Sequence, residues 1–248
     1  MLEAVKVALD PSPVQGRRLL SHAGAARFAY NAGLVHVKEA IGAGEKPEWH
    51  FFSIVNWWNA SKNELAVDAD GKPWWSENSK EAYCSGLRSL ASALSNWSKS
   101  RKGDRKGRKV GFPKFKSKAG SVPRFAYTTD FKLIEGDPKG VWLPRIGRVH
   151  CMENVAERVN GAKVLRMTIS QRAGRWYVSL TVEREDKPVM KPPNGGAVGV
   201  DLGVKNLATL SDGTVIENPR YLKKSERKLK KAQQAPSRKI KGSNRRAK

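Results

Sequence analysis

The sequence predicts a multidomain α+β protein, and three features of the amino-acid pattern support this fold class. Helical periodicity fills most of residues 14–100, short β-prone runs fill residues 124–185, and a separate strand–turn–strand pattern begins at residue 198. Because helices and strands occupy different stretches instead of alternating, the pattern is typical of an α+β arrangement. The chain has 248 residues, of which 39% are hydrophobic, enough for one large domain or two to three small ones.

The first hundred residues are expected to form one strand followed by three helices. Apolar residues alternate with polar or small ones over 5–9, and two prolines stop this run, as at the end of a strand. Apolar residues recur at spacings of three or four over 14–41, 51–65 and 78–100, which predicts three helices. Four tryptophans of this region are expected to pack in the core, because their rings bury a large apolar area; they are Trp57, Trp58, Trp74 and Trp75.

A strongly basic stretch follows the third helix. Residues 99–118 hold ten Lys or Arg and one acid, a composition that also suits a solvated linker. The run 111–116 places phenylalanines between lysines, and this favours a surface that follows a nucleic-acid backbone. The residues expected to contact phosphates are Lys114, Lys116 and Arg124. Phe112 and Phe115 are the candidates for base stacking, with a position in the core as the favoured alternative.

Residues 124–185 are expected to form a small barrel or sandwich, because short β-prone runs follow one another closely. The clearest run covers residues 175–182, with Gly174 at the turn before it. The stretch 187–196 contains three prolines and two glycines and is the predicted linker and domain boundary. The other predicted strands cover residues 125–128, 132–134, 141–143, 148–151 and 164–170.

The last segment is expected to be a strand–turn–strand unit followed by a basic helix. Gly213 lies in the predicted hairpin turn, where a glycine is free to take a positive φ. The helix begins at Pro219, and Pro236 is expected to end or kink it. The predicted strands cover residues 198–204, 206–210 and 214–216.

The first of these strands carries a single carboxylate, Asp201, within an apolar run. A carboxylate in a buried strand is costly unless it is paired, hydrogen-bonded or bound to a cation. Asp201 is therefore the candidate metal ligand and catalytic residue. A strand–turn–strand with one inward Asp is the opening of an RNase H-like fold, in which several carboxylates hold two divalent ions, and hard carboxylate oxygens suit Mg²⁺.

The formal net charge of +24 and the pI near 10.3 imply a polyanionic partner, with nucleic acid as the first candidate. A membrane surface is second, but no apolar run is long enough to span a bilayer. The N-terminus has the pattern of a strand and not of a signal peptide, so a cytoplasmic, nucleoid-associated location is expected. Cys84 and Cys151 form no CxxC pair, so no zinc site or disulfide framework is expected.

Residues 198–233 closely resemble the first RuvC segment of the TnpB family. These are transposon-encoded proteins of the OrfB type that act as RNA-guided DNA nucleases. The resemblance continues upstream, in order, through nearly the whole chain. The motifs that carry it are residues 200–205, 210–213 and 217–222 in the last segment, and residues 26–31, 111–116, 143–147 and 176–179 before it.

The resemblance implies a helical recognition lobe, residues 11–109, inserted in a β-barrel wedge domain formed by residues 1–10 and 110–190. The first strands of an RNase H-like (RuvC) nuclease fold would follow in residues 191–248. Guide RNA and a double-stranded DNA target would be the partners, since in RNA-guided proteins base pairing reads the sequence. Arg27 and Asn31, one helical turn apart within the first helical motif, would face the nucleic acid or tie the helix to the barrel.

The sequence departs from this family in lacking the later catalytic carboxylates and the paired CxxC motifs. We therefore expect a C-terminally truncated chain that binds nucleic acid but does not cleave it, with Mg²⁺ as the cofactor of the complete protein. Two alternatives are a nuclease-dead, RNA-guided DNA-binding regulator and a non-specific basic nucleic-acid-binding protein.

Overall fold

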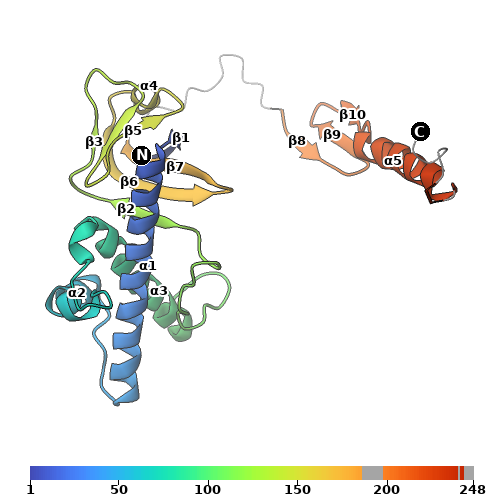
Figure 1. Ribbon diagram of the computed structural model, residues 1–248. Helices are drawn as coiled ribbons and strands as arrows, with labels where there is room; N and C mark the ends of the chain where they lie inside the picture. The colour runs from blue at the N-terminus through green and yellow to red at the C-terminus, as the bar shows by residue number, and fades with distance from the viewer. Residues whose placement is uncertain (186–197, 240, 243–248) are drawn as a thin grey trace. The chain divides into compact units, whose positions relative to one another are not determined.

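The computed structural model describes residues 1–185, 198–239 and 241–242, and the chain divides into two compact units (Figure 1). The first unit covers residues 1–186 and the second covers residues 187–248. The predicted linker 187–196 lies outside the described residues.

The N-terminal part of the first unit is one strand and three helices, as the periodicity predicts. Helix α1 begins at Pro13 because the Ser12 hydroxyl accepts a hydrogen bond from the backbone N–H of Gln15, while the Gln15 side chain accepts one from Ser12 N–H. The last long helix ends at Gly103, whose φ of 86° closes the helix in the left-handed conformation. The elements are β1 (Leu2–Asp10), α1 (Pro13–Gly42), α2 (Phe51–Leu65), the 3₁₀ turn η1 (Trp75–Glu77) and α3 (Lys80–Lys102).

The remaining strands of the first unit pair with β1 in one antiparallel sheet of seven strands, in the order β2-β6-β7-β1-β5-β4-β3. Strand β1 lies near the middle of the sheet although it comes first in sequence. The added elements are β2 (Arg124–Tyr127), β3 (Lys132–Leu133), β4 (Gly140–Leu143), β5 (Gly147–Cys151), α4 (Val155–Val159), β6 (Lys163–Arg172) and β7 (Arg175–Glu183). All the predicted strands are present, whereas the short helix α4 was not predicted.

The α+β class is confirmed, but the sheet is not the closed barrel that the family resemblance implies; the residue pattern itself predicted a barrel or a sandwich. In the described part of the chain, the edge strands β2 and β3 do not pair with each other. Strand β3 has only two residues, too few to close a ladder. On its other side from β6, strand β2 has no further strand as a partner, and it packs against helices α3 and α1.

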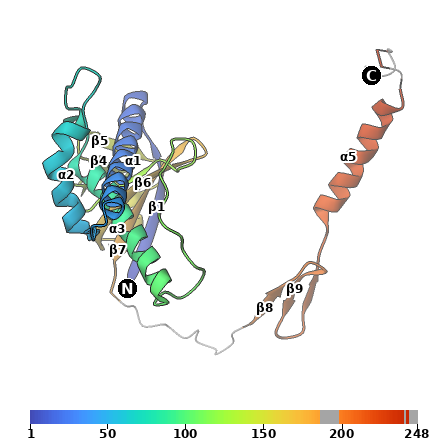
Figure 2. The same ribbon diagram turned by 90° about the horizontal axis from the view of Figure 1, so that it is seen from below.

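One hydrophobic core joins the sheet to the three long helices. In Figures 1 and 2, α1 runs from the strands past α2 and α3, so it packs against both the sheet and the other two long helices. The predicted core role of the tryptophans is confirmed: Trp58 is 3% exposed, and Trp57, Trp74 and Trp75 are partly buried against the same core. The helices and the sheet of the first unit therefore hold each other in place.

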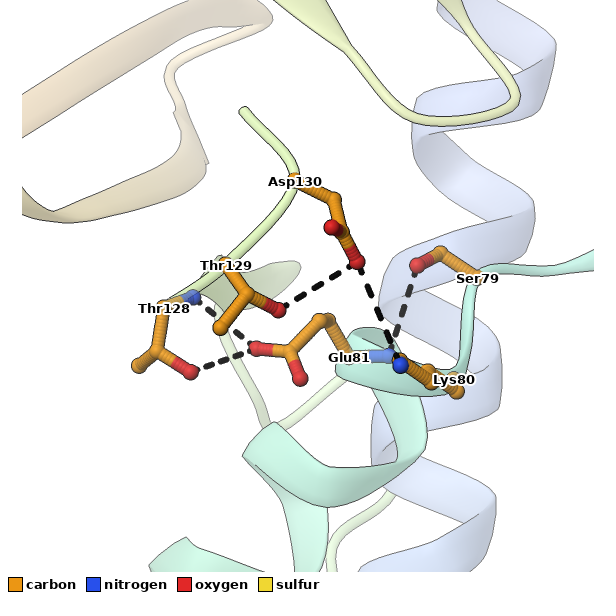
Figure 3. Close-up of polar contacts among 6 residues, drawn as sticks. All are labelled: Ser79, Lys80, Glu81, Thr128, Thr129 and Asp130. Carbon is orange, nitrogen blue, oxygen red and sulfur yellow. Dashed lines mark hydrogen bonds and ion pairs between the residues drawn. The ribbon is translucent and has the colours of Figure 1, made fainter. Parts of the chain in front are cut away.

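A polar bridge joins the N-terminus of α3 to the end of β2 (Figure 3). The Glu81 carboxylate accepts hydrogen bonds from the backbone N–H and the hydroxyl of Thr128, at 2.9 and 2.6 Å. The Ser79 hydroxyl accepts a hydrogen bond from Glu81 N–H and caps the helix. An ion pair of Lys80 with Asp130 lies beside this bridge at 4.0 Å.

We expect Glu81→Ala to lower the free energy of unfolding by about 1–2 kcal/mol, because two hydrogen bonds to a charged acceptor are lost. Lys80→Ala is the matched control. The ion pair of Lys80 with Asp130 is exposed to solvent, so removal of the Lys80 side chain should change the free energy of unfolding by less than about 0.5 kcal/mol. Urea unfolding of the two variants measures the difference, and equal effects would contradict the structural role of the Glu81 bridge.

The second unit contains a three-stranded antiparallel sheet in the order β10-β9-β8, followed by helix α5. Its elements are β8 (Val200–Leu202), β9 (Asn206–Leu210), β10 (Val215–Glu217) and α5 (Tyr221–Ser237). Gly213 has a φ of 88° in the hairpin turn, as predicted. Pro236 lies inside α5, and the helix ends one residue later, at Ser237.

Candidate nucleic-acid interface

Four cationic side chains gather around one cavity of about 280 Å³ in the first unit. We call it the basic pocket, defined by Arg27, Lys116, Arg124 and Arg166. Its walls come from α1, α3, the segment between α3 and β2, the start of β2, and strand β6. Three of its cations are residues that the sequence singled out, and they come together from positions nearly a hundred residues apart. Hydroxyl groups complete the lining, from Ser85, Ser89 and Ser121.

Asn31 fixes the segment that brings Lys116 into the pocket. Its side-chain amide donates a hydrogen bond to the carbonyl oxygen of Lys116, and its amide oxygen accepts one from Lys116 N–H, both at 2.9 Å. Both polar groups of Asn31 are therefore engaged by the backbone. Of the two roles predicted for this residue, the geometry matches that of a tie from helix α1 to a neighbouring segment.

Arg166 reaches the pocket from strand β6 next to an irregularity in the sheet. The register between β6 and β7 shifts between Val164 and Arg166. A β-bulge of this kind redirects the side chains that follow it and is common beside functional sites. The Nε atom of Arg166 is buried without a hydrogen-bond partner in the described part of the chain. The remaining N–H groups of its guanidinium are the donors through which Arg166 can line the pocket.

The electrostatics of the pocket favour an anionic ligand. Burial lowers the pKa of Lys116, and the nearby charge of Arg124 lowers it further. Burial also lowers the pKa of Arg166, with Arg124 and Arg88 as the next causes. The acid that opposes this effect at Arg166 is Glu81, whose carboxylate is already engaged by Thr128. Like charges in a partly buried site repel each other, and a bound phosphate would relieve that repulsion.

The two phenylalanines of the basic segment lie in different environments. The Phe112 ring packs edge-on against Trp97, with ring centroids 4.9 Å apart, and is partly buried against the core. The Phe115 side chain is 51% exposed, and the Lys38 ammonium lies 4.8 Å from its ring centroid. The packing of Phe112 matches the core alternative, whereas Phe115 keeps a ring surface for stacking. Lys114, between them, is exposed on the same segment.

The candidate metal ligand Asp201 lies in a strand that is exposed along its length. Its neighbours Val200 and Leu202 are 57% and 77% exposed, so the expectation of a buried strand is wrong for the described residues. Within the second unit itself, the described residues place no second layer on strand β8.

The described residues do not fit a two-ion magnesium centre. No three His, Cys, Asp or Glu side chains lie close enough together in residues 1–185, 198–239 and 241–242 to hold a metal ion. A single carboxylate does not hold two divalent ions. We therefore derive no catalytic step through Mg²⁺ from this geometry.

Sequence reasoning missed Arg166, because it treated residues 164–170 only as a strand. A weak signal was present: an arginine in the middle of an apolar β-run needs a reason to be there.

No helix of the described residues is both long and apolar enough to cross a membrane.

Comparisons with known proteins give the family. Residues 179–248 match a family profile, OrfB of IS605, that is described as a probable transposase. Residues 1–46 match a second profile of the same group, described as a helix-turn-helix domain. In the structure these residues form strand β1 and the single continuous helix α1, so no helix-turn-helix is present there.

Curated relatives match nearly the whole chain. A Mycobacterium tuberculosis protein, Rv2885c, is 35% identical over 98% of this chain, and Escherichia coli InsQ is 34% identical over 98% of it. Both carry the provisional name of RNA-guided DNA endonuclease. A Streptomyces pristinaespiralis protein of the same provisional name is 45% identical over 36% of this chain.

The chain belongs to the OrfB family of IS605-type transposon proteins, the TnpB family that its motifs indicated. It spans 57% and 56% of the lengths of the first two relatives.

Proposed function

We propose that the first unit is a nucleic-acid-binding platform of a transposon-encoded protein of the RNA-guided DNA endonuclease type. The observation that carries the proposal is the basic pocket, where four cations from distant parts of the chain face one cavity. Phosphate groups match this arrangement, because arginine guanidinium groups bind phosphate oxygens through charge-assisted hydrogen bonds.

The proposed partners are a guide RNA and a DNA target, in line with the names of the relatives. We assign residues 11–109 as the recognition lobe, residues 1–10 and 110–190 as the wedge, and residues 191–248 as the start of the RuvC-like part. Lys116, Arg124, Arg166 and Arg27 contact the phosphates, Asn31 positions Lys116, and Phe115 offers a ring for stacking.

Asp201 is proposed as the first carboxylate of the RuvC-like part, and Mg²⁺ as the ion of the family's reaction. The proposal for this chain is limited to binding, because the described residues do not assemble the set of carboxylates that such a reaction needs.

The double variant Arg124→Gln, Arg166→Gln tests the proposal. We expect it to bind a fluorescein-labelled RNA hairpin at least about 10-fold more weakly than the wild type, since hydrogen bonds to charged groups are worth about 1.5–3 kcal/mol. The slope of log K against log salt concentration should fall by about 1 to 2 because phosphate contacts are lost. Fluorescence anisotropy across a salt series measures both quantities.

The matched control is Lys46→Gln, Lys72→Gln. It removes the same charge from two exposed lysines that do not line the basic pocket. If this control weakens binding as much as the pocket variant does, general charge and not the pocket carries the affinity, and the proposal is wrong.

A further inference from the structure

Lys116 differs chemically from the other three cations of the basic pocket. Arginine keeps its proton in proteins, whereas a lysine that loses its proton presents a nucleophilic amine. The Lys116 side chain is half-buried and lines the cavity. Its ammonium forms no hydrogen bond and no ion pair in the described part of the chain, and its one printed contact there is with a ring. The nitrogen is therefore not engaged by an acid.

The surroundings of the Lys116 nitrogen favour the free amine more than the surroundings of an exposed lysine do. Burial lowers the pKa of Lys116, and the charge of Arg124 acts in the same direction. The Nζ atom lies 3.8 Å from the centroid of the Tyr30 ring. This contact favours the charged form and holds the nitrogen in one place. No carboxylate lines the cavity to add to that effect.

The same cavity can hold a phosphate group beside this amine. Arg27, Arg124 and Arg166 line it together with Lys116. Guanidinium groups bind phosphate oxygens through paired, charge-assisted hydrogen bonds. The cavity volume of about 280 Å³ lies just below the range of about 300–1,000 Å³ that is typical of pockets for larger ligands. The ligand that fits is therefore a small phosphorylated molecule.

We propose that the basic pocket binds a small acyl phosphate and that Lys116 is acylated by it. In an acyl phosphate a single oxygen joins the phosphorus to the acyl carbon. A phosphate held by the arginines thus places the acyl carbon in the cavity that the amine lines, and such proximity accelerates a reaction. In a nucleotide-linked thioester the acyl carbon is many bonds from the nearest phosphate, so one small cavity does not hold both.

The acylation step balances without a further reactant. The lone pair of the deprotonated Lys116 nitrogen attacks the acyl carbon, the N–C bond forms, and the C–O bond to the phosphate breaks. The phosphate leaves with the electron pair of that bond and takes one proton from the nitrogen. Arg124 and Arg166 stabilise the charge of the leaving phosphate. The product is an uncharged amide, so acylation removes one of the four cations of the pocket.

The test treats the full chain with acetyl phosphate and follows the acetylation of each lysine by peptide mass spectrometry. Lys114 is the internal reference, since it lies on the same segment, is exposed and does not line the cavity. Lys116 should be acetylated at least about 5-fold faster than Lys114. Arg124→Gln should slow Lys116 about 10-fold and leave Lys114 unchanged, because a hydrogen bond to a charged group is worth about that factor.

Arg17→Gln is the matched control, because Arg17 is also exposed and lies outside the basic pocket. It should leave both acetylation rates unchanged. Arg124 is exposed as well, so its replacement does not disturb the core. Equal rates at Lys116 and Lys114 in the wild type, or an Arg124→Gln chain that behaves like Arg17→Gln, would overturn the inference.

A neutral acylating ester, N-hydroxysuccinimidyl acetate, separates phosphate binding from simple reactivity of the amine. It offers no anion to the arginines, so the preference for Lys116 over Lys114 should be at least about 5-fold smaller than with acetyl phosphate. The same preference with both reagents would show a reactive lysine without an acyl-phosphate site and would overturn the inference. These measurements contain no nucleic acid, so their failure leaves the proposed function standing.

Discussion

Gly86→Ala is expected to destabilise the first unit by about 3 kcal/mol or more. A Cβ atom at position 86 would lie 2.0 Å from the backbone carbonyl oxygen of Ala26 and 2.9 Å from its carbonyl carbon. Real Cβ atoms do not approach a backbone that closely, and a backbone carbonyl in the middle of a helix has no rotamer through which to move away. Helices α1 and α3 would have to separate, and overpacking of this kind costs 1–3 kcal/mol or more.

The same change should also affect binding, because Gly86 and Ala26 both line the basic pocket. Separation of the two helices would move Arg27 away from the other cations. Gly24→Ala is the matched control: Gly24 lies in α1, and an added Cβ would meet no atom within 4 Å. It should be neutral or stabilising by up to about 1 kcal/mol, since alanine is the better helix former. Urea unfolding of both variants measures the effect, and an unchanged midpoint for Gly86→Ala would show that the helices are not in close contact.

Acid should destabilise the first unit through His22, by about 2 kcal/mol at pH 5. His22 is 1% exposed, and burial lowers its pKa to about 4 from the usual 6.5, with the charges of Arg145 and Arg18 acting in the same direction. Its Nδ1 lies 2.9 Å from the Arg18 carbonyl, and its Nε2 accepts a hydrogen bond from Ser79 N–H at 3.1 Å. The neutral ring with the proton on Nδ1 satisfies both contacts, whereas a protonated ring loses the acceptor at Nε2.

The direction follows from linkage. The histidine has a lower pKa in the folded state than in the unfolded state, so the unfolded state binds the proton more tightly. The stabilisation is complete above pH 6.5 and is lost as the pH falls towards 4. The total loss is about 3 kcal/mol, because the pKa of His22 falls from 6.5 to about 4 on folding and one pKa unit is worth about 1.4 kcal/mol.

His22→Gln provides the comparison for this pH dependence. Glutamine can donate to Arg18 and accept from Ser79 but does not titrate in this range. The difference in unfolding free energy between wild type and variant should therefore shrink from pH 7 to pH 5. A constant difference over that range would rule out His22 as the source of acid sensitivity.

The periodicity of the sequence determined the elements well because each is governed by local physics. The predicted helix over 14–41 is α1, and the predicted strand over 175–182 is β7, each within two residues at either end. Alternation and helical spacing report which face of an element is buried, and this does not depend on its partner. The short helix α4 was missed, since five residues carry too little periodicity to read.

The barrel that the resemblance implied does not close, because closure depends on contacts between elements that are distant in sequence. The number of β-prone runs predicted many strands correctly. Whether β2 meets another strand or the helices α1 and α3 depends on how the core fills, and no local pattern encodes that. The burial of Asp201 was likewise inferred from apolar neighbours, but burial requires a second layer.

The sequence by itself determined that the protein is basic, α+β, a member of the OrfB family and suited to a polyanionic partner. It also selected Arg27, Lys116 and Arg124 as candidates. Only the tertiary structure decided that these three residues share one pocket with Arg166 and that the Asn31 amide binds the backbone of Lys116. Charge and periodicity are properties of the chain, whereas a binding site is a set of distances between residues that are far apart in sequence, and those distances exist only after the core has packed.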